Sequence, residues 1–73
     1  MRTFGVSPDL ARRIWRVVDE LGEPAHAAWV ARLLSLRVAT VRRALAWMEA
    51  RGYLRSHDPP GTVQRQYIAW VRP

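Results

Sequence analysis

Apolar residues recur at helical spacing between Ser7 and Gly22. Most lie three or four positions apart, as on one face of an α-helix: Leu10, Ile14, Val17, Val18 and Leu21. The segment also begins with the signals of a helix start, because a serine precedes a proline and an aspartate. Glycine is the residue type that most often ends a helix. We predict a helix from Pro8 to about Leu21, with Ser7 as its N-cap.

Two further helices are predicted on either side of a short turn at 35–37. The first begins near His26, a candidate N-cap, and has an inward face of small and aliphatic residues: Ala27, Val30, Ala31 and Leu34, with Leu33 partly buried. The second covers 38–51, because its apolar residues are four and three positions apart: Val41, Leu45 and Met48. Gly52 ends it. In the turn, Leu36 is expected to point into the core.

Beyond Gly52 the pattern changes to the alternation that is typical of β-strands. Residues 53–55 begin one strand, turn-forming residues at 57–61 predict a loop, and 63–71 form a second strand. The two strands make a hairpin over 53–71. The connector at 23–25 leaves room for one short strand, and residues 1–6 are expected to form an N-terminal arm. The chain is therefore predicted to be a single α+β domain over 1–73.

The composition excludes several classes of protein. Hydrophobic residues make up 49% of the chain, which is too many for a disordered protein, and the absence of cysteine excludes a disulfide framework or a thiolate metal site. No uncharged run is long enough to span a bilayer, and the N-terminus lacks the apolar core of a signal peptide. We expect a cytoplasmic protein without a membrane partner.

Positive charge is concentrated in the second part of the chain. The formal net charge is +6, and residues 1–31 are balanced, so the whole excess lies within 32–73. All twelve basic residues are arginine. A GC-rich genome explains the choice of arginine over lysine but not the one-sided placement. A guanidinium group can bind phosphate or guanine through two hydrogen bonds, so the placement favours nucleic acid as the partner.

The outer face of the predicted helix 38–51 is basic and lacks a carboxylate. Opposite its apolar stripe lie small side chains and two adjacent arginines: Val38, Ala39, Arg42, Arg43 and Ala46. A solvated helix usually mixes charges of both signs on its outer face. This pattern indicates a face that lies close against something negatively charged.

The segment from Ala31 to Leu54, ARLLSLRVATVRRALAWMEARGYL, resembles the winged helix-turn-helix pattern of bacterial, archaeal and viral transcriptional regulators. The small residue of the second helix is Ala31, and the leucines that flank the turn are Leu34 and Leu36. The recognition-helix signature is Thr40, Val41, Arg43 and Leu45. The exit into the wing is Glu49, Gly52, Tyr53 and Leu54. The resemblance implies three helices with a C-terminal β-hairpin wing.

It also implies that the helix 38–51 is a recognition helix that enters the major groove of double-stranded DNA. The expected DNA-binding residues are those of the helix and its N-cap, together with two arginines of the wing: Arg37, Val38, Ala39, Arg42, Arg43, Ala46, Arg55 and Arg65. The function implied is that of a small, nucleoid-associated transcriptional regulator that needs no cofactor.

Two residues depart from this pattern. Ser35 stands where glycine is usual, so a serine must adopt a conformation that glycine adopts more easily. Arg37 stands where a serine or threonine N-cap is usual, and it puts a positive charge at the positive end of the helix dipole. Because Arg37 should cost stability in this position, we expect it to contact a phosphate or base at the edge of the groove.

Tryptophan is unusually frequent, with four in 73 residues. Trp15 or Trp70 could complete the core, whereas Trp29 and Trp47 are expected on outer sides of their helices. Exposed aromatic residues mark interfaces, so we predict a homodimer with Trp15, Trp29 and Trp47 as candidate contacts. The arm at 1–6 folding over one of them is the simpler explanation.

A second class of function therefore stays open, namely a winged-helix module that binds a protein partner through its tryptophans. An enzyme is not expected, because the sequence has no carboxylate pair, no nucleophile and base set and no metal-ligand spacing. A DNA-binding protein should lose affinity steeply with salt, whereas a protein-binding module should not.

Overall fold

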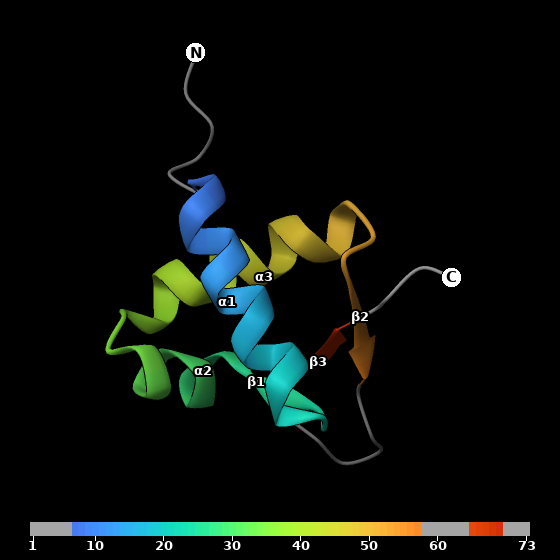
Figure 1. Ribbon diagram of the computed structural model, residues 1–73, viewed down its shortest axis with the longest axis horizontal. Coiled ribbons are helices and arrows are strands. Elements are labelled where there is room, and N and C mark those ends of the chain that lie inside the picture. Colours follow the sequence, from blue (N-terminus) through green and yellow to red (C-terminus); the bar gives the residue numbers. More distant parts are fainter. Residues whose placement is uncertain (1–6, 58–64, 70–73) are drawn as a thin grey trace.

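The computed structural model describes residues 7–57 and 65–69, which form three helices and three short strands (Figure 1). In chain order they are α1 (Pro8–Leu21), β1 (Ala25–His26), α2 (Ala27–Leu34), α3 (Val38–Ala50), β2 (Leu54–His57) and β3 (Gln66–Ala69). The predicted arm at 1–6 lies outside the described residues, as do 58–64 and 70–71 of the predicted hairpin and Trp70.

The first helix forms as its sequence signals predict. The Ser7 hydroxyl accepts a hydrogen bond from the backbone N–H of Leu10 at 3.1 Å, and Gly22 ends α1 in the left-handed conformation with φ of 66°. Ile14 and Val18 are buried, as is Ala11, while the other predicted stripe residues are half-buried against the core. The predicted bounds and N-cap of α1 are therefore confirmed.

The turn between α2 and α3 is held by a helix-ending hydrogen-bond pattern. The N–H of Leu36 donates to the carbonyl of Ala31 at 2.9 Å, and the N–H of Ser35 donates to the carbonyl of Arg32 at 3.4 Å. This is the Schellman arrangement, which needs a left-handed residue just past the helix. Ser35 has that conformation, with φ of 56° and ψ of 46°, and Leu36 packs against the core. Both expectations for this turn are confirmed.

Replacing Ser35 by glycine should stabilise the fold by about 0.5–1 kcal/mol, because glycine adopts the left-handed conformation without a Cβ penalty. The midpoint of thermal unfolding should rise by roughly 2–8 °C for a domain of this size. Ser56→Gly is the matched control, since Ser56 lies in the extended strand β2, where glycine should lower the midpoint. Equal shifts from both substitutions would contradict the role given to Ser35.

The core lies between the three helices and one face of the sheet. α3 contributes Val41, Leu45 and Met48, as predicted, and also Ala44, which is fully buried.

His26 caps α2 as expected, because its Nδ1 accepts a hydrogen bond from the N–H of Trp29 at 3.2 Å. The expectation that Leu33 is partly buried is wrong: its side chain is 52% exposed, because the inward face of α2 is made by Val30 and its neighbours.

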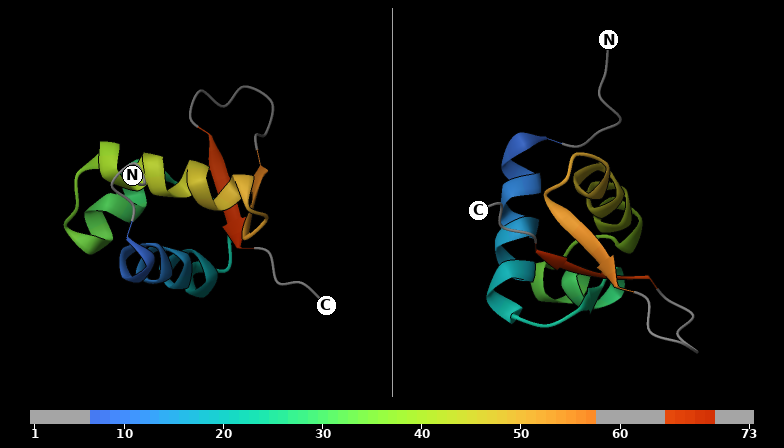
Figure 2. Two further views of the ribbon diagram at one scale, coloured as in Figure 1. Left: turned by 90° about the horizontal axis from the view of Figure 1, so that it is seen from above. Right: turned by 90° about the vertical axis from the view of Figure 1, so that its right-hand side faces the viewer.

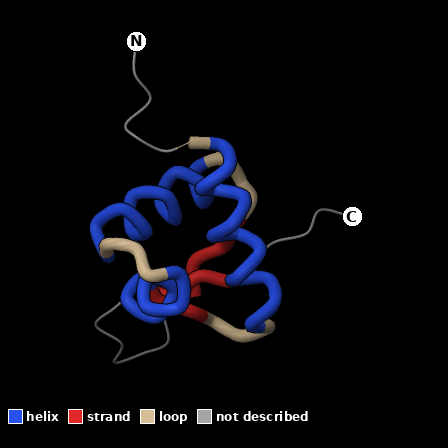
Figure 3. Tube along the Cα trace, turned by 60° about the vertical axis from the view of Figure 1, so that its left-hand side comes forward, coloured by secondary structure: helices blue, strands red, loops and turns tan. Residues whose placement is uncertain are grey.

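The strands form a three-stranded antiparallel sheet in the order β1-β3-β2. Figure 3 shows the strands, in red, next to the helices. Ala25 and Ser56 both pair with Tyr67, whose side chain is buried, so this face of the sheet covers the helices. His57 pairs with Gln66 and belongs to β2 rather than to the loop predicted from residue 57. The prediction was wrong at His57 because it followed the turn-forming residues of the sequence and not the pairing with β3.

The layout is α+β, as predicted, with helices connected by a tight turn and then a β-hairpin. The short strand allowed for near 23–25 is present as β1 and gives the hairpin a third strand. This arrangement is compatible with a helix-turn-helix followed by a wing. Among the described residues, no helix combines the length and apolar character needed to cross a membrane.

Candidate nucleic-acid interface

The outer face of α3 is exposed along its whole length. Its exposed residues are short or basic: Ala39, Arg42, Arg43, Ala46 and Ala50. They project away from the buried stripe because they fall between its members in the helical repeat. Val38 differs from the expectation, since it is half-buried and packs against the core, so only part of its side chain is available on this face.

Three arginines on or beside this face make no ion pair or hydrogen bond with any described side chain: Arg37, Arg42 and Arg43. Arg37 occupies the N-cap position of α3, is exposed and makes no capping hydrogen bond, as expected from its residue type. The first turn of α3 has no acidic residue. The amino-terminal half of α3 therefore combines three free guanidinium groups with the positive end of the helix dipole.

The hairpin contributes charge beside the other end of α3. Arg55 is exposed on β2 and lies opposite Ile68 of β3, which is 36% exposed. Arg65 is also exposed, and its Nη1 lies 3.5 Å from Oε1 of Glu49. Glu49 is the single carboxylate of α3, so its charge faces the hairpin and is paired there. The ion pair links the start of β3 to α3, which sequence spacing could not have predicted.

Seen from above, α1 lies on one side of α3, and the end of the hairpin where β2 stops and β3 begins lies on the other (Figure 2, left). The hairpin therefore lies beside the carboxyl end of α3, where Arg65 pairs with Glu49, whereas Arg37 lies at the opposite end of the helix.

No family model matches the chain, and neither the curated proteins nor the solved structures compared with it give a match. The interface is therefore inferred from the exposed face of α3 and the arginines beside it. Among residues 7–57 and 65–69, no group of three or more histidine, cysteine or acidic side chains could hold a metal ion.

The predicted interface tryptophans are all half-buried and packed against the core. Trp29 lies beside the ring of His26, with the ring centroids 6.4 Å apart. Trp15 and Trp47 instead line a groove between α1 and α3, which also includes Tyr53. Sequence reasoning missed this grouping and the role of Tyr53. The grouping joins residues far apart in the chain, so sequence spacing carried no signal for it.

Proposed function

We propose that this protein binds double-stranded DNA as a small transcriptional regulator, with α3 in the major groove and the β2–β3 hairpin along the flanking backbone. The observation that carries the proposal is the exposed outer face of α3, which combines short side chains with arginines that have no carboxylate partner among the described residues. A regulator of this kind would associate with the nucleoid.

The chemistry of the face suits the floor of a major groove. Ala39 and Ala46 are short enough to let the helix approach the base edges, and their methyl groups can contact thymine. Arg42 and Arg43 can each donate two hydrogen bonds to guanine or to a phosphate. Arg55 is suited to backbone phosphates beside the groove, where contacts raise affinity without reading sequence.

Selection from a pool of duplexes with a randomised centre tests the function directly. We expect enrichment of a short common sequence, followed by saturable binding of the enriched duplex in a fluorescence anisotropy titration. The same sequence as a single strand should bind much more weakly, because a single strand has no major groove. Failure to enrich any sequence, with equal binding of both forms, would argue for nonspecific attraction only.

Substituting Arg37 by serine should raise stability while weakening DNA binding. Serine can accept a hydrogen bond from the first turn of α3, which is worth about 1 kcal/mol, and it removes an unfavourable charge from the helix start. The loss of a phosphate contact should lower affinity for all duplexes alike. Thermal unfolding and anisotropy titration measure the two effects.

Arg37→Gln is the control for this pair of effects, because it removes the charge without supplying a good N-cap. We expect it to weaken DNA binding as much as Arg37→Ser, with a smaller gain in stability. If Arg37→Ser stabilised the protein and left DNA affinity unchanged, Arg37 would have no role in binding.

We further propose that the protein acts as a homodimer, since helix-turn-helix proteins commonly bind two half-sites related by a two-fold axis. The exposed Leu33 and the half-buried Trp29 lie four residues apart on α2 and offer an apolar contact. Sedimentation at high micromolar concentration should give the mass of a dimer, and Leu33→Glu should give a monomer. A monomeric wild-type protein would refute this part of the proposal.

A further inference from the structure

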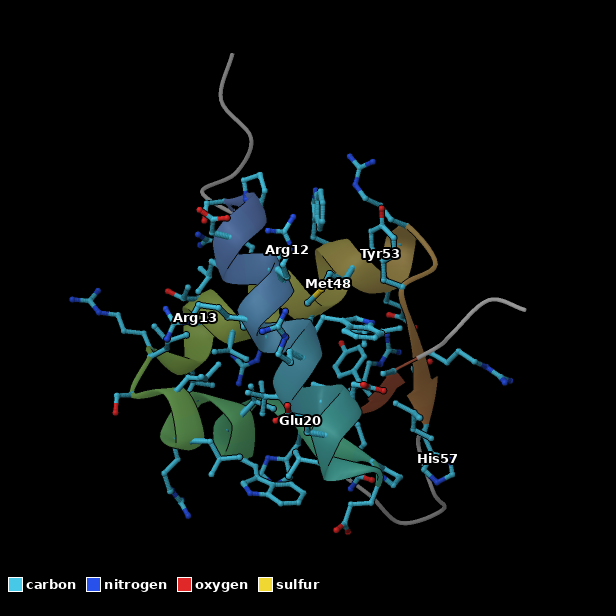
Figure 4. The ribbon with its side chains drawn as sticks, viewed as in Figure 1. Arg12, Arg13, Glu20, Met48, Tyr53 and His57 are labelled. Atoms are coloured by element: carbon cyan, nitrogen blue, oxygen red, sulfur yellow. The ribbon has the colours of Figure 1, made fainter. Side chains whose placement is uncertain are left out.

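A groove of about 330 Å³ lies between α1 and α3. It is lined by apolar and aromatic side chains with a single charged residue among them: Pro8, Ala11, Arg12, Trp15, Trp47, Met48 and Tyr53. Figure 4 shows Arg12 on α1 and Tyr53 beyond the end of α3, with Met48 on α3 between them. The volume is at the lower end of the range for ligand clefts, roughly 300–1,000 Å³, and suits one bulky side chain.

The walls of the groove are held by backbone geometry. The N–H of Tyr53 donates to the carbonyl of Met48 at 2.9 Å, as part of the hydrogen-bond pattern that ends α3 at Gly52 with φ of 86°. The carbonyl of Tyr53 in turn accepts a hydrogen bond from the indole N–H of Trp15 at 2.9 Å. Trp15 and Tyr53 are therefore fixed relative to each other, although half of Tyr53 is exposed.

Each wall carries a guanidinium group beside the aromatic rings. At the carboxyl end of α3, the guanidinium of Arg51 lies 4.4 Å from the ring centroid of Trp47, a cation–π contact, and the ring centroids of Trp47 and Tyr53 are 6.4 Å apart. Arg51 makes no ion pair with a described residue. On α1, Arg12 lies 3.6 Å from Asp9, but both side chains are largely exposed, so this pair is weak and exchangeable.

We propose that this groove docks an acidic segment of a partner protein, with one aromatic or large aliphatic side chain between Trp15, Trp47 and Tyr53. Carboxylates on either side of that anchor pair with Arg12 and Arg51. The lining has no carboxylate of its own, so its charge is complementary to an acidic partner and repels a basic one.

The groove adjoins one side of the DNA-binding face. Trp47 follows Arg42 by five positions, which places the two side chains roughly 140° apart around the axis of α3, but it follows Arg43 by four, which places them roughly 40° apart. The partner would then sit on the α1 side of the bound protein. The proposal does not depend on DNA binding, because the groove exists whatever the outer face of α3 contacts.

Short labelled peptides with one phenylalanine, tryptophan or leucine between glutamates provide the probe, with lysine-flanked peptides for comparison. The full chain should bind the acidic set saturably in anisotropy titrations and the basic set at least about tenfold more weakly. In spectra of the ¹⁵N-labelled protein, the indole N–H signal of Trp15 should shift on binding. The absence of binding by every acidic peptide would overturn the proposal.

Charge-reversal variants locate the binding site. Arg12→Glu and Arg51→Glu should each lower the affinity about fivefold or more, whereas Arg13→Glu, the same change on the exposed side of α1 away from the groove, should leave it within about twofold. Thermal unfolding confirms that each variant is folded. Equal losses from Arg12→Glu and Arg13→Glu would mean nonspecific attraction and would overturn the site.

Other occupants of the groove give distinct results. A shift of the Trp15 signal with oligonucleotides instead of peptides would mean a nucleic-acid site. If the protein self-associated, if Arg12→Glu abolished that association, and if acidic peptides did not compete with it, the groove would bind a second copy of the chain. Either result overturns the proposal.

Arg42→Ala should weaken DNA binding without changing peptide affinity, so a failure of DNA binding by α3 can be distinguished from a failure of peptide binding by the groove.

Discussion

Replacing Arg42 by alanine is expected to lower affinity for the selected duplex by about 1–3 kcal/mol, which is roughly 5- to 150-fold. The guanidinium of Arg42 is exposed on the outer face of α3 and has no ion pair among the described residues. It can therefore turn toward a base edge without first breaking an internal contact. If Arg42 reads a base, the variant should also tolerate changes at one position of the duplex that the wild-type protein rejects. Anisotropy titrations against single-position duplex variants measure both effects.

Arg16→Ala is the matched control, because Arg16 is an exposed arginine on α1 and its loss changes the net charge equally. We expect its affinity for the selected duplex to remain within about twofold of wild type at physiological salt, where charges beyond about 8 Å are screened. If Arg16→Ala and Arg42→Ala weakened binding to the same extent, net charge rather than the outer face of α3 would explain the affinity.

Replacing Leu45 by alanine is expected to destabilise the protein by about 2–5 kcal/mol. Leu45 is fully buried on the inner face of α3, and its loss leaves a cavity among residues that come from different helices. A domain of 73 residues has a total stability of roughly 4–11 kcal/mol, so this change removes a large fraction of it. Urea unfolding followed by circular dichroism gives the difference.

Leu33→Ala tests the same substitution at a position that is 52% exposed on α2. We expect a change of no more than about 0.5 kcal/mol at low protein concentration, where a dimer contact would not contribute. A comparable loss at both leucines would contradict the core described for this fold.

The helices could be predicted closely because their end signals are local. Ser7, Gly22 and Gly52 act within a few residues of their own position, so the sequence contains the whole signal. The left-handed conformation of Ser35 was predicted because the pattern that this segment resembles usually has glycine at that position. α3 ends at Ala50, one residue before the predicted bound, since Arg51 already has a non-helical ψ of 1°.

Burial at the edges of helices could not be predicted, because it depends on which elements pack beside each face. Leu33 is exposed since no neighbour covers that side of α2 among the described residues, whereas Trp47 and Val38 are half-buried by contacts across the fold. The helical repeat gives the direction of each side chain but not its neighbour. The outer face of α3 could therefore be predicted from spacing, because it belongs to one helix. The groove could not, because it lies between α1 and α3.

Contacts between residues far apart in the chain could not be predicted from the sequence either. The ion pair of Arg65 with Glu49 and the hydrogen bond of Trp15 with Tyr53 each join residues far apart in the chain. Likewise, the assignment of His57 to a strand follows from its pairing with Gln66 and not from its own propensity. Each of these contacts depends on which elements pack or pair with one another in the folded protein.

The salt dependence of duplex DNA binding is the sharpest test of whether Arg42 and Arg43 of α3 bind DNA. The affinities of the wild-type chain and of the double variant Arg42→Ala, Arg43→Ala should be measured at several salt concentrations. We predict that wild-type affinity falls steeply with salt, with a slope of about −0.9 in log–log form per phosphate contact, and that the double variant binds weakly with a shallower slope. Wild-type affinity that does not change with salt, or equal slopes for the two chains, would contradict the account.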